Sequence, residues 1–126
     1  MVKSGLMAEL DEILANLCDQ VDGATAAAVG SVDGLLVEQS GAHSQVMSAF
    51  VAELTNVLSA ARTAMAGRLE AGSPGEIIMS AERQVAYVRT LNDDLFCVLL
   101  LEAGGNLGKA RLYSGYAGKR ILESLT

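Results

Sequence analysis

The stretch ATAAAVGSVDGLLVEQS, residues 24–40, decides the fold. Two apolar runs, residues 24–29 and 35–37, flank Val32-Asp33-Gly34. Asp-Gly between strand-like runs is a strong hairpin signal, because a tight type I′ turn needs a positive φ at its central residues. The first run carries no charge and is mostly alanine. We therefore expect a strand that is covered on both faces by elements lying close to its backbone.

The segment before the hairpin, residues 6–21, predicts an amphipathic helix. Its apolar residues recur at helical spacing and form one stripe. They are Leu6, Leu10, Ile13, Leu14, Leu17, Cys18 and Val21. Asp22-Gly23 ends the helix, since glycine is common just beyond a helix C-terminus. We expect this helix to dock on a sheet and to lie at the surface.

A long helix follows the hairpin, from a predicted N-cap at Ser44 to about Leu69. Its bulky apolar residues share one side, while the opposite side carries small, uncharged residues. The bulky residues are Val46, Met47, Phe50, Val51, Leu54, Val57, Leu58, Ala61, Met65 and Leu69. A solvated helix face usually carries Lys, Glu and Arg. We expect the bulky side to pack on the sheet and the small-residue edges to contact another protein; an alanine-rich surface that only favours helix formation is the alternative.

Three strands are predicted after the long helix, which Gly72 and Pro74 stop. They span residues 76–81, 84–91 and 95–102. The turns between them are short, so these strands must be antiparallel neighbours. Residues 95–101, LFCVLLL, include no polar position, which predicts a central strand.

The last helix is predicted at residues 107–125, with Asn106 as its N-cap. The order is therefore helix, two strands, helix, three strands, helix, or α-β-β-α-β-β-β-α. We expect the whole chain, residues 1–126, to form a single α+β domain with helices on both faces of a sheet.

Composition excludes several classes of partner. The chain has 126 residues, 51% of them hydrophobic, and a formal net charge of −6 at pH 7. An acidic chain disfavours nucleic acid and anionic membranes as partners, since both bind clustered Lys and Arg. No apolar run reaches the roughly 18 residues that span a bilayer, and no secretory signal is visible at the N-terminus. We expect a cytoplasmic protein that does not insert into a membrane.

Two glycine-containing segments are candidates for a phosphate site. The segment ending in Gly108-Lys109 fails as a phosphate loop, because Ala103 replaces its first glycine and Ala110 its hydroxyl residue. Gly104-Gly105-Asn106 at a helix start could hold an anion through free amides. A helix cap and tight turn explains the same residues, and we favour that interpretation.

Other chemistry-bearing residues are few. His43 is the only histidine and is predicted to be a surface residue, since a metal site or a Ser-His-Asp triad needs more partners. Asp93-Asp94 follows Asn92 and has ordinary turn composition. Cys18 and Cys97 are predicted to be buried, reduced thiols rather than a disulfide. We expect no catalytic residue, cofactor or metal site, and no enzymatic activity.

Several local phrases occur in an order that resembles a known family. They are Val21-Asp22-Gly23-Ala24, Val32-Asp33-Gly34-Leu35, the long alanine-rich helix, and Asn106-Leu107-Gly108-Lys109-Ala110-Arg111. In this order and spacing the chain resembles the roadblock (dynein light-chain) superfamily, including its bacterial MglB-like members. The resemblance implies a five-stranded antiparallel sheet with the middle helix on one face and the two terminal helices on the other.

The resemblance also implies a function. Such proteins are not enzymes; they dimerise through the middle helix and the third strand, and they bind Ras-like small GTPases as activators, scaffolds or regulatory subunits. We therefore expect a homodimer that binds a Ras-like GTPase. The residues expected at the dimer or partner interface are Phe50, Glu53, Leu54, Val57, Ala60, Ala61, Ala64, Met65, Ile77, Ile78 and Met79.

Two alternatives remain open. The chain could be a structural adaptor in a larger complex without a GTPase. It could also be a small-molecule sensor of PAS or GAF type, since those folds pair an antiparallel sheet with helices. A sensor pocket usually shows spare polar or aromatic residues, and Tyr87 is the main one that the strands offer.

Overall fold

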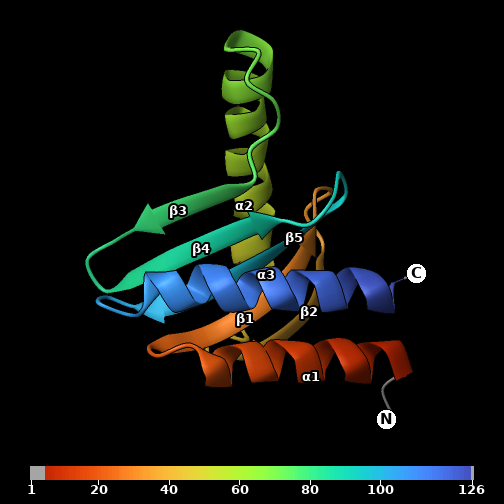
Figure 1. Cartoon of the computed structure of the whole chain (residues 1–126), viewed down its shortest axis with the longest axis vertical. Helices are drawn as coiled ribbons and strands as arrows, with labels where there is room; N and C mark the ends of the chain where they lie inside the picture. The colour runs from red at the N-terminus through yellow and green to blue at the C-terminus, as the bar shows by residue number, and fades with distance from the viewer. Residues whose placement is uncertain (1–4, 126) are drawn as a thin grey trace.

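The computed structural model describes residues 5–125 and shows a sheet between two helical layers (Figure 1). Its elements are α1 (Gly5–Gln20), β1 (Ala24–Ser31), β2 (Leu36–Gly41), α2 (Met47–Arg62) with its π-helical continuation η1 (Thr63–Arg68), β3 (Glu76–Ser80), β4 (Gln84–Thr90), β5 (Leu95–Glu102) and α3 (Leu107–Ser124). Residues 1–4 fall outside the described part. The expectation that the N-terminus carries no secretory signal rests partly on these residues. None of the described helices is long and apolar enough to cross a membrane.

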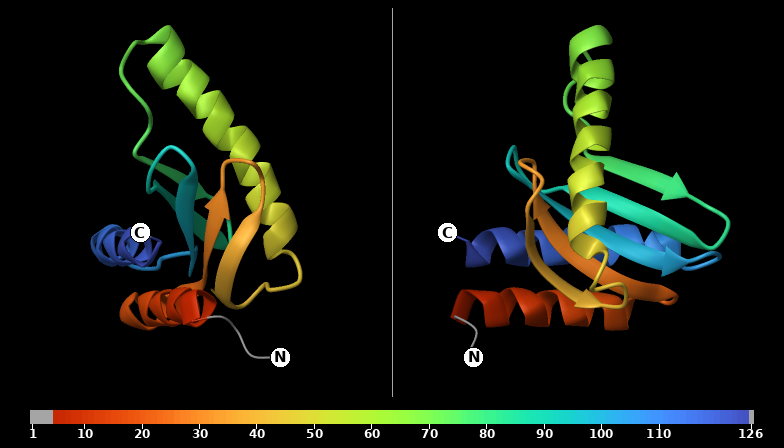
Figure 2. Two further views of the ribbon diagram at one scale, coloured as in Figure 1. Left: turned by 90° about the vertical axis from the view of Figure 1, so that its right-hand side faces the viewer. Right: turned by 180° about the vertical axis from the view of Figure 1, so that it is seen from behind.

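The five strands form one antiparallel sheet in the order β2-β1-β5-β4-β3. Helices α1 and α3 lie side by side on one face, and α2 lies on the other (Figure 2). The strand β5 is central, as its all-apolar sequence predicts, and β2 and β3 are the edges. The predicted α+β fold, with its element order and layers, is confirmed.

Strand β1 is buried on both faces, which explains its alanines. Ala27 and Val29 pack in the core beneath α1 and α3, whereas Ala26 and Ala28 pack in the core beneath α2. Gly30 continues this pattern, because a Cβ there would lie 2.6 Å from Cζ of Phe96 and 2.7 Å from Cγ1 of Val51. Small side chains in β1 therefore let helices approach the sheet closely from both sides.

The turn of the first hairpin differs from the predicted type I′ turn. Gly34 has a φ of +92°, but no other residue of the turn has a positive φ. The Gly34 N–H donates to the carbonyl of Ser31, and the Ser31 N–H donates to the carbonyl of Leu35. The loop therefore has three residues rather than two, and only its last residue needs the left-handed conformation that glycine adopts easily.

The prediction that Ser44 caps the long helix is wrong. The N-cap is Val46, and no side chain caps the helix there. Instead, His43 adopts a φ of +65°, and its carbonyl accepts hydrogen bonds from the N–H groups of Val46 and Met47. A backbone turn thus satisfies donors that the Ser44 hydroxyl was expected to satisfy. At its far end the α-helix passes into η1, a π-helical segment that the periodicity did not predict.

We expect the substitution Gly30→Ala to lower the free energy of unfolding by about 1–3 kcal/mol, because the added methyl overpacks the contact between Phe96 and Val51. The measurement is urea denaturation at fixed protein concentration. Gly108→Ala is the matched control, since a Cβ there would meet only Oδ1 of Asn106, at 3.5 Å. Equal stability of the Gly30→Ala variant and the wild type would contradict the close approach of α2.

Candidate partner-binding surface

The continuous helix formed by α2 and η1 docks on the sheet only through its first half. Its buried residues are Met47, Val51, Leu54 and Leu58. Beyond Leu58, no residue of α2 or η1 is buried, and this part extends past the sheet (Figure 2). Met65 and Leu69 are 40% and 68% exposed. The expectation that the whole bulky side packs on the sheet therefore holds for the first half and is wrong for the second.

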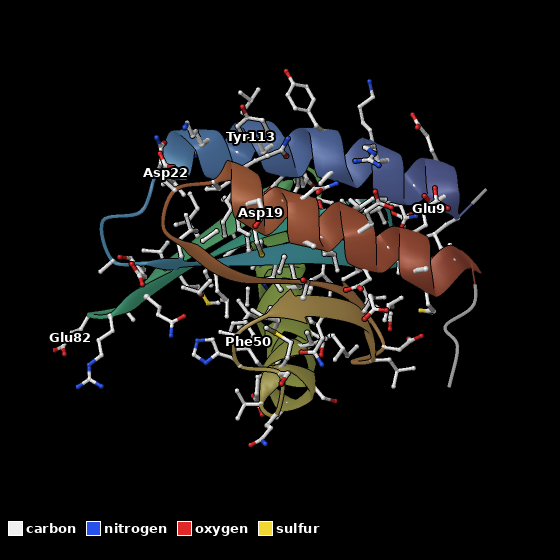
Figure 3. The ribbon with its side chains drawn as sticks, turned by 90° about the horizontal axis from the view of Figure 1, so that it is seen from below. Glu9, Asp19, Asp22, Phe50, Glu82 and Tyr113 are labelled. Atoms are coloured by element: carbon white, nitrogen blue, oxygen red, sulfur yellow. The ribbon has the colours of Figure 1, made fainter. Side chains whose placement is uncertain are left out.

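One side of α2 and the start of η1, here called the α2 flank, borders the buried stripe and has little charge. Its residues recur every three or four positions and so share one face of the helix. They are Val46, Phe50, Glu53, Val57, Ala60, Ala61 and Ala64. Figure 3 shows Phe50 on the α2 side of the sheet and Tyr113 on the opposite, α3 side.

An apolar hollow of about 310 Å³ lies where the α2 flank meets the sheet. Helix α2 packs mainly on β1 and β2, so the part of the same sheet face near β3 and β4 is less completely covered. The hollow is lined by His43, Val46, Met47, Phe50, Met79, Ala81, Gln84, Ala86 and Leu100. Nε2 of His43 and Nε2 of Gln84 are 3.2 Å apart and hydrogen-bonded. His43 is exposed, as predicted.

Strand β3 forms the sheet edge beside this hollow. Within residues 5–125 it pairs with β4 alone, so its outer N–H and C=O groups have no partner strand. Its sequence, EIIMS, has no lysine or proline, the residues that commonly prevent an edge from pairing. Ile77 and Met79 pack partly against the core beneath α2, while Ile78 is 37% exposed.

The structure brings together some of the predicted interface residues. Phe50 and Met79 meet at the hollow. Val57, Ala60, Ala64 and Met65 are exposed beyond it, as is Glu53, and Ala61 is half-buried. Leu54 is 2% exposed and belongs to the core, so its side chain is not accessible to a partner.

Sequence reasoning missed the floor of the hollow. Ala86 and Leu100 are cross-strand partners on the face of the sheet that α2 covers. The alternation of residue types in β4 could have placed Ala86 on that face, whereas the all-apolar β5 gives no such signal for Leu100. The one available indication of a hollow was the small side chain of Ala86, which lies near the start of α2.

A polar network anchors β3 to α3 on the other face of the sheet. The Tyr87 hydroxyl donates to Oε2 of Glu76 at 2.7 Å, and Nη2 of Arg111 donates to Oε1 of Glu76 at 2.7 Å. The hydrogen bond from Arg111 and, to a smaller extent, the one from Tyr87 hold the pKa of Glu76 below its usual value. The pKa of Tyr87 is raised mainly by burial and, to a smaller extent, by its hydrogen bond to Glu76. The start of the edge strand is thereby held in place.

Two asparagines that the sequence singled out have structural roles. Asn106 caps α3, its side chain accepting from the N–H of Lys109, and Asn92 accepts from the N–H groups of Asp94 and Leu95 in the following turn. Both thiols are free. Burial raises the pKa of Cys18 to about 11 and that of Cys97 to about 12. Among the described residues, no group of three or more His, Cys, Asp or Glu side chains is placed to hold a metal ion.

The family model of the Roadblock/LC7 domain matches residues 10–101, from within α1 to Leu101 in β5. The chain belongs to the Roadblock/LC7 family. The match covers the sheet, the α2 flank and the β3 edge. No curated protein sequence matches the chain at a significant level.

Solved structures with the same fold include bacterial MglB and MglC proteins. The gliding protein MglB from Thermus thermophilus is 18% identical, with a TM-score of 0.85 and coverage of 98% of this chain and 93% of that one. An MglB with a tetrameric arrangement is also 18% identical, with a TM-score of 0.87 and the same coverage. MglC from Myxococcus xanthus is 28% identical, with a TM-score of 0.62 and coverage of 90% and 96%.

We expect Glu76→Gln to lower stability at neutral pH and to remove part of its dependence on acid pH. A carboxylate whose pKa is lowered by folding stabilises the fold above its unfolded-state pKa, and that contribution disappears as pH falls through the lower, folded-state pKa. The difference in unfolding free energy between variant and wild type should therefore shrink on acidification. Urea denaturation across a pH series measures it.

Glu82→Gln is the matched control for this substitution, because Glu82 is an exposed carboxylate in the turn between β3 and β4. A Glu76→Gln variant whose stability follows the wild-type pH profile in parallel would show that the network does not hold β3.

Proposed function

We propose that this chain is a homodimeric regulatory or scaffold protein of the cytoplasm that binds a Ras-like small GTPase and modulates its activity or localisation. One observation carries the homodimer part of the proposal. The α2 flank, the apolar hollow and the unpaired edge of β3 form one continuous surface. Such a corner offers side-chain packing and backbone hydrogen bonds to the same partner.

A second copy of the chain suits this surface. In a two-fold dimer each patch meets itself, so β3 can pair antiparallel with β3 of the partner and join the two sheets. The same symmetry can bring two α2 flanks together. Alanines at 60 and 64 allow close approach of the helix backbones, and Glu53 is the one charged residue on the flank.

Exposed apolar residues also favour a partner at this surface. Val57 is 37% exposed, and Met65 is 40% exposed. Contiguous exposed apolar residues of this kind commonly mark interaction sites. An MglB of the same fold occurs in a tetrameric arrangement, which supports self-association for this chain.

The GTPase part of the proposal rests on family membership. The sequence resembles the MglB-like branch, whose members regulate Ras-like GTPases without being enzymes, and MglB structures share its fold. A dimer built on α2 would leave α1 and α3 at its outer surface and the far ends of both α2 helices available to a partner.

We expect the wild-type protein to have twice its 13.1 kDa chain mass at micromolar concentration, and the Ala60→Glu variant to have that of one chain. The substitution places a carboxylate on the α2 flank, where burial without a partner is costly. Light scattering after size-exclusion chromatography measures the mass, and circular dichroism verifies the fold.

Ala8→Glu is the matched control, because it adds the same charge to an exposed position of α1, on the other face of the sheet. It should remain dimeric. A wild-type protein that is monomeric at these concentrations, or an Ala60→Glu variant that stays dimeric, would refute the proposed interface.

For the GTPase, we expect immobilised wild-type protein to retain a Ras-like GTPase of the same genome in one nucleotide state more than in the other. The measurement compares binding of GDP-loaded proteins with that of proteins loaded with a non-hydrolysable GTP analogue. Ala8→Glu should bind like the wild type. Failure to retain any of these GTPases in either state, with dimerisation intact, would favour the adaptor without a GTPase.

A further inference from the structure

Arg89 occupies an unusual position between β4 and α3. It lies directly opposite Glu76 in the β3–β4 ladder and, like Tyr87 two residues before it, on the face of the sheet that α3 covers. The residue is half-buried, and its guanidinium lies beneath the middle of α3 near Gly115.

Within residues 5–125, most N–H donors of the Arg89 guanidinium have no hydrogen-bond partner. Its Nη1 donates to the Tyr87 hydroxyl at 3.2 Å, whereas an arginine carries five N–H donors. The carboxylate of Glu76 accepts from Tyr87 and Arg111 instead. Among the described residues, the local group of Glu76, Arg89 and Arg111 thus carries a net charge of about +1.

The glycine above Arg89 is not required by packing. A Cβ on Gly115 would lie 3.7 Å from both Cζ and Nη2 of Arg89, which is ordinary contact. Glycine in the interior of a helix is destabilising relative to alanine. Gly118 differs, because a Cβ there would come within 2.8 Å of Cδ2 of Leu91. A Cβ at Gly118 would therefore require the Leu91 side chain to shift, whereas a Cβ at Gly115 would require no shift.

Gly115 borders a hollow of about 170 Å³, and a methyl group at that position would occupy part of it. Arg89, Thr90 and Lys119 also line the hollow, and among residues 5–125 no carboxylate lines it. Two cations beside an open space are notable in a chain whose net charge is −6. Guanidinium binds carboxylate and phosphate oxygens through parallel hydrogen bonds, and lysine adds a point charge.

We propose that this hollow binds an oxyanion of the carboxylate or phosphate type, with Arg89 and Lys119 as its ligands and Gly115 keeping the space open. The site lies on the α3 side of the sheet, away from the α2 flank, and does not depend on the proposed dimer. The two sources of the oxyanion are an acidic side chain of a bound protein and a free phosphate group.

The experiment is a nuclear magnetic resonance titration of the full chain, in two arms at constant ionic strength. One arm adds inorganic phosphate, and the other adds a tetraglutamate peptide. We expect saturable shifts of the Gly115 and Gly118 amides and of the Arg89 Nε–H in at least one arm. Saturation by phosphate identifies a phosphate site, and saturation by the peptide alone identifies a carboxylate site.

Variants separate binding from folding. Arg89→Gln and Lys119→Gln should each weaken the affinity by about tenfold or more, as expected for loss of a charge-assisted contact. Gly115→Ala should weaken binding without lowering thermal stability. Arg83→Gln, which removes an exposed charge from the β3–β4 turn, is the matched control and should bind like the wild type.

Because Lys119 is exposed on α3, its variant should fold even if Arg89→Gln does not. The proposal is overturned if neither probe gives saturable shifts at Gly115 and Gly118. It is equally overturned if the Lys119→Gln and Gly115→Ala variants bind like Arg83→Gln.

Discussion

The close packing of both helical layers against β1 is the constraint on which the rest of the structure depends. Residues 26–29 are fully buried between α1 and α3 on one side and α2 on the other. A Cβ at Gly30 would overlap Phe96 and Val51. Because α2 packs mainly over β1 and β2, it leaves the β3 and β4 side of the sheet partly open. The candidate partner surface is thus a consequence of where the small residues lie.

The two faces of the sheet contain different kinds of site. The α2 face presents an apolar hollow and an edge strand without a partner, which suit a second protein chain. The α3 face presents cations around Glu76 and a small hollow at Arg89, which suit an oxygen anion. The Glu76 carboxylate connects them, since it sits on the edge strand and accepts hydrogen bonds from β4 and α3.

Much of the fold could be predicted because periodicity and turn residues report local structure. The apolar run of β5 indicated a central strand, and Asn106 indicated a helix cap. The prediction of Ser44 as the N-cap failed because His43 adopts a left-handed conformation and its carbonyl accepts from the first N–H groups of the helix. The residue pattern does not indicate this backbone turn. The point at which α2 leaves the sheet depends on sheet width, so the apolar pattern extending to Leu69 could not reveal it. The hollow could not be predicted either, because it depends on how α2 lies across the sheet.

The central ladder of the sheet also has a consequence for folding. It joins β1, residues 24–31, to β5, residues 95–102, so its partners are far apart along the chain. Non-local pairing of this kind slows folding, because the loop must close before contacts compensate its entropy. During synthesis the first hairpin and α2 emerge well before β5 is available. Their apolar faces stay uncovered until β5, the strand that completes both cores, has been synthesised. The nascent chain is most prone to misassociation during that interval.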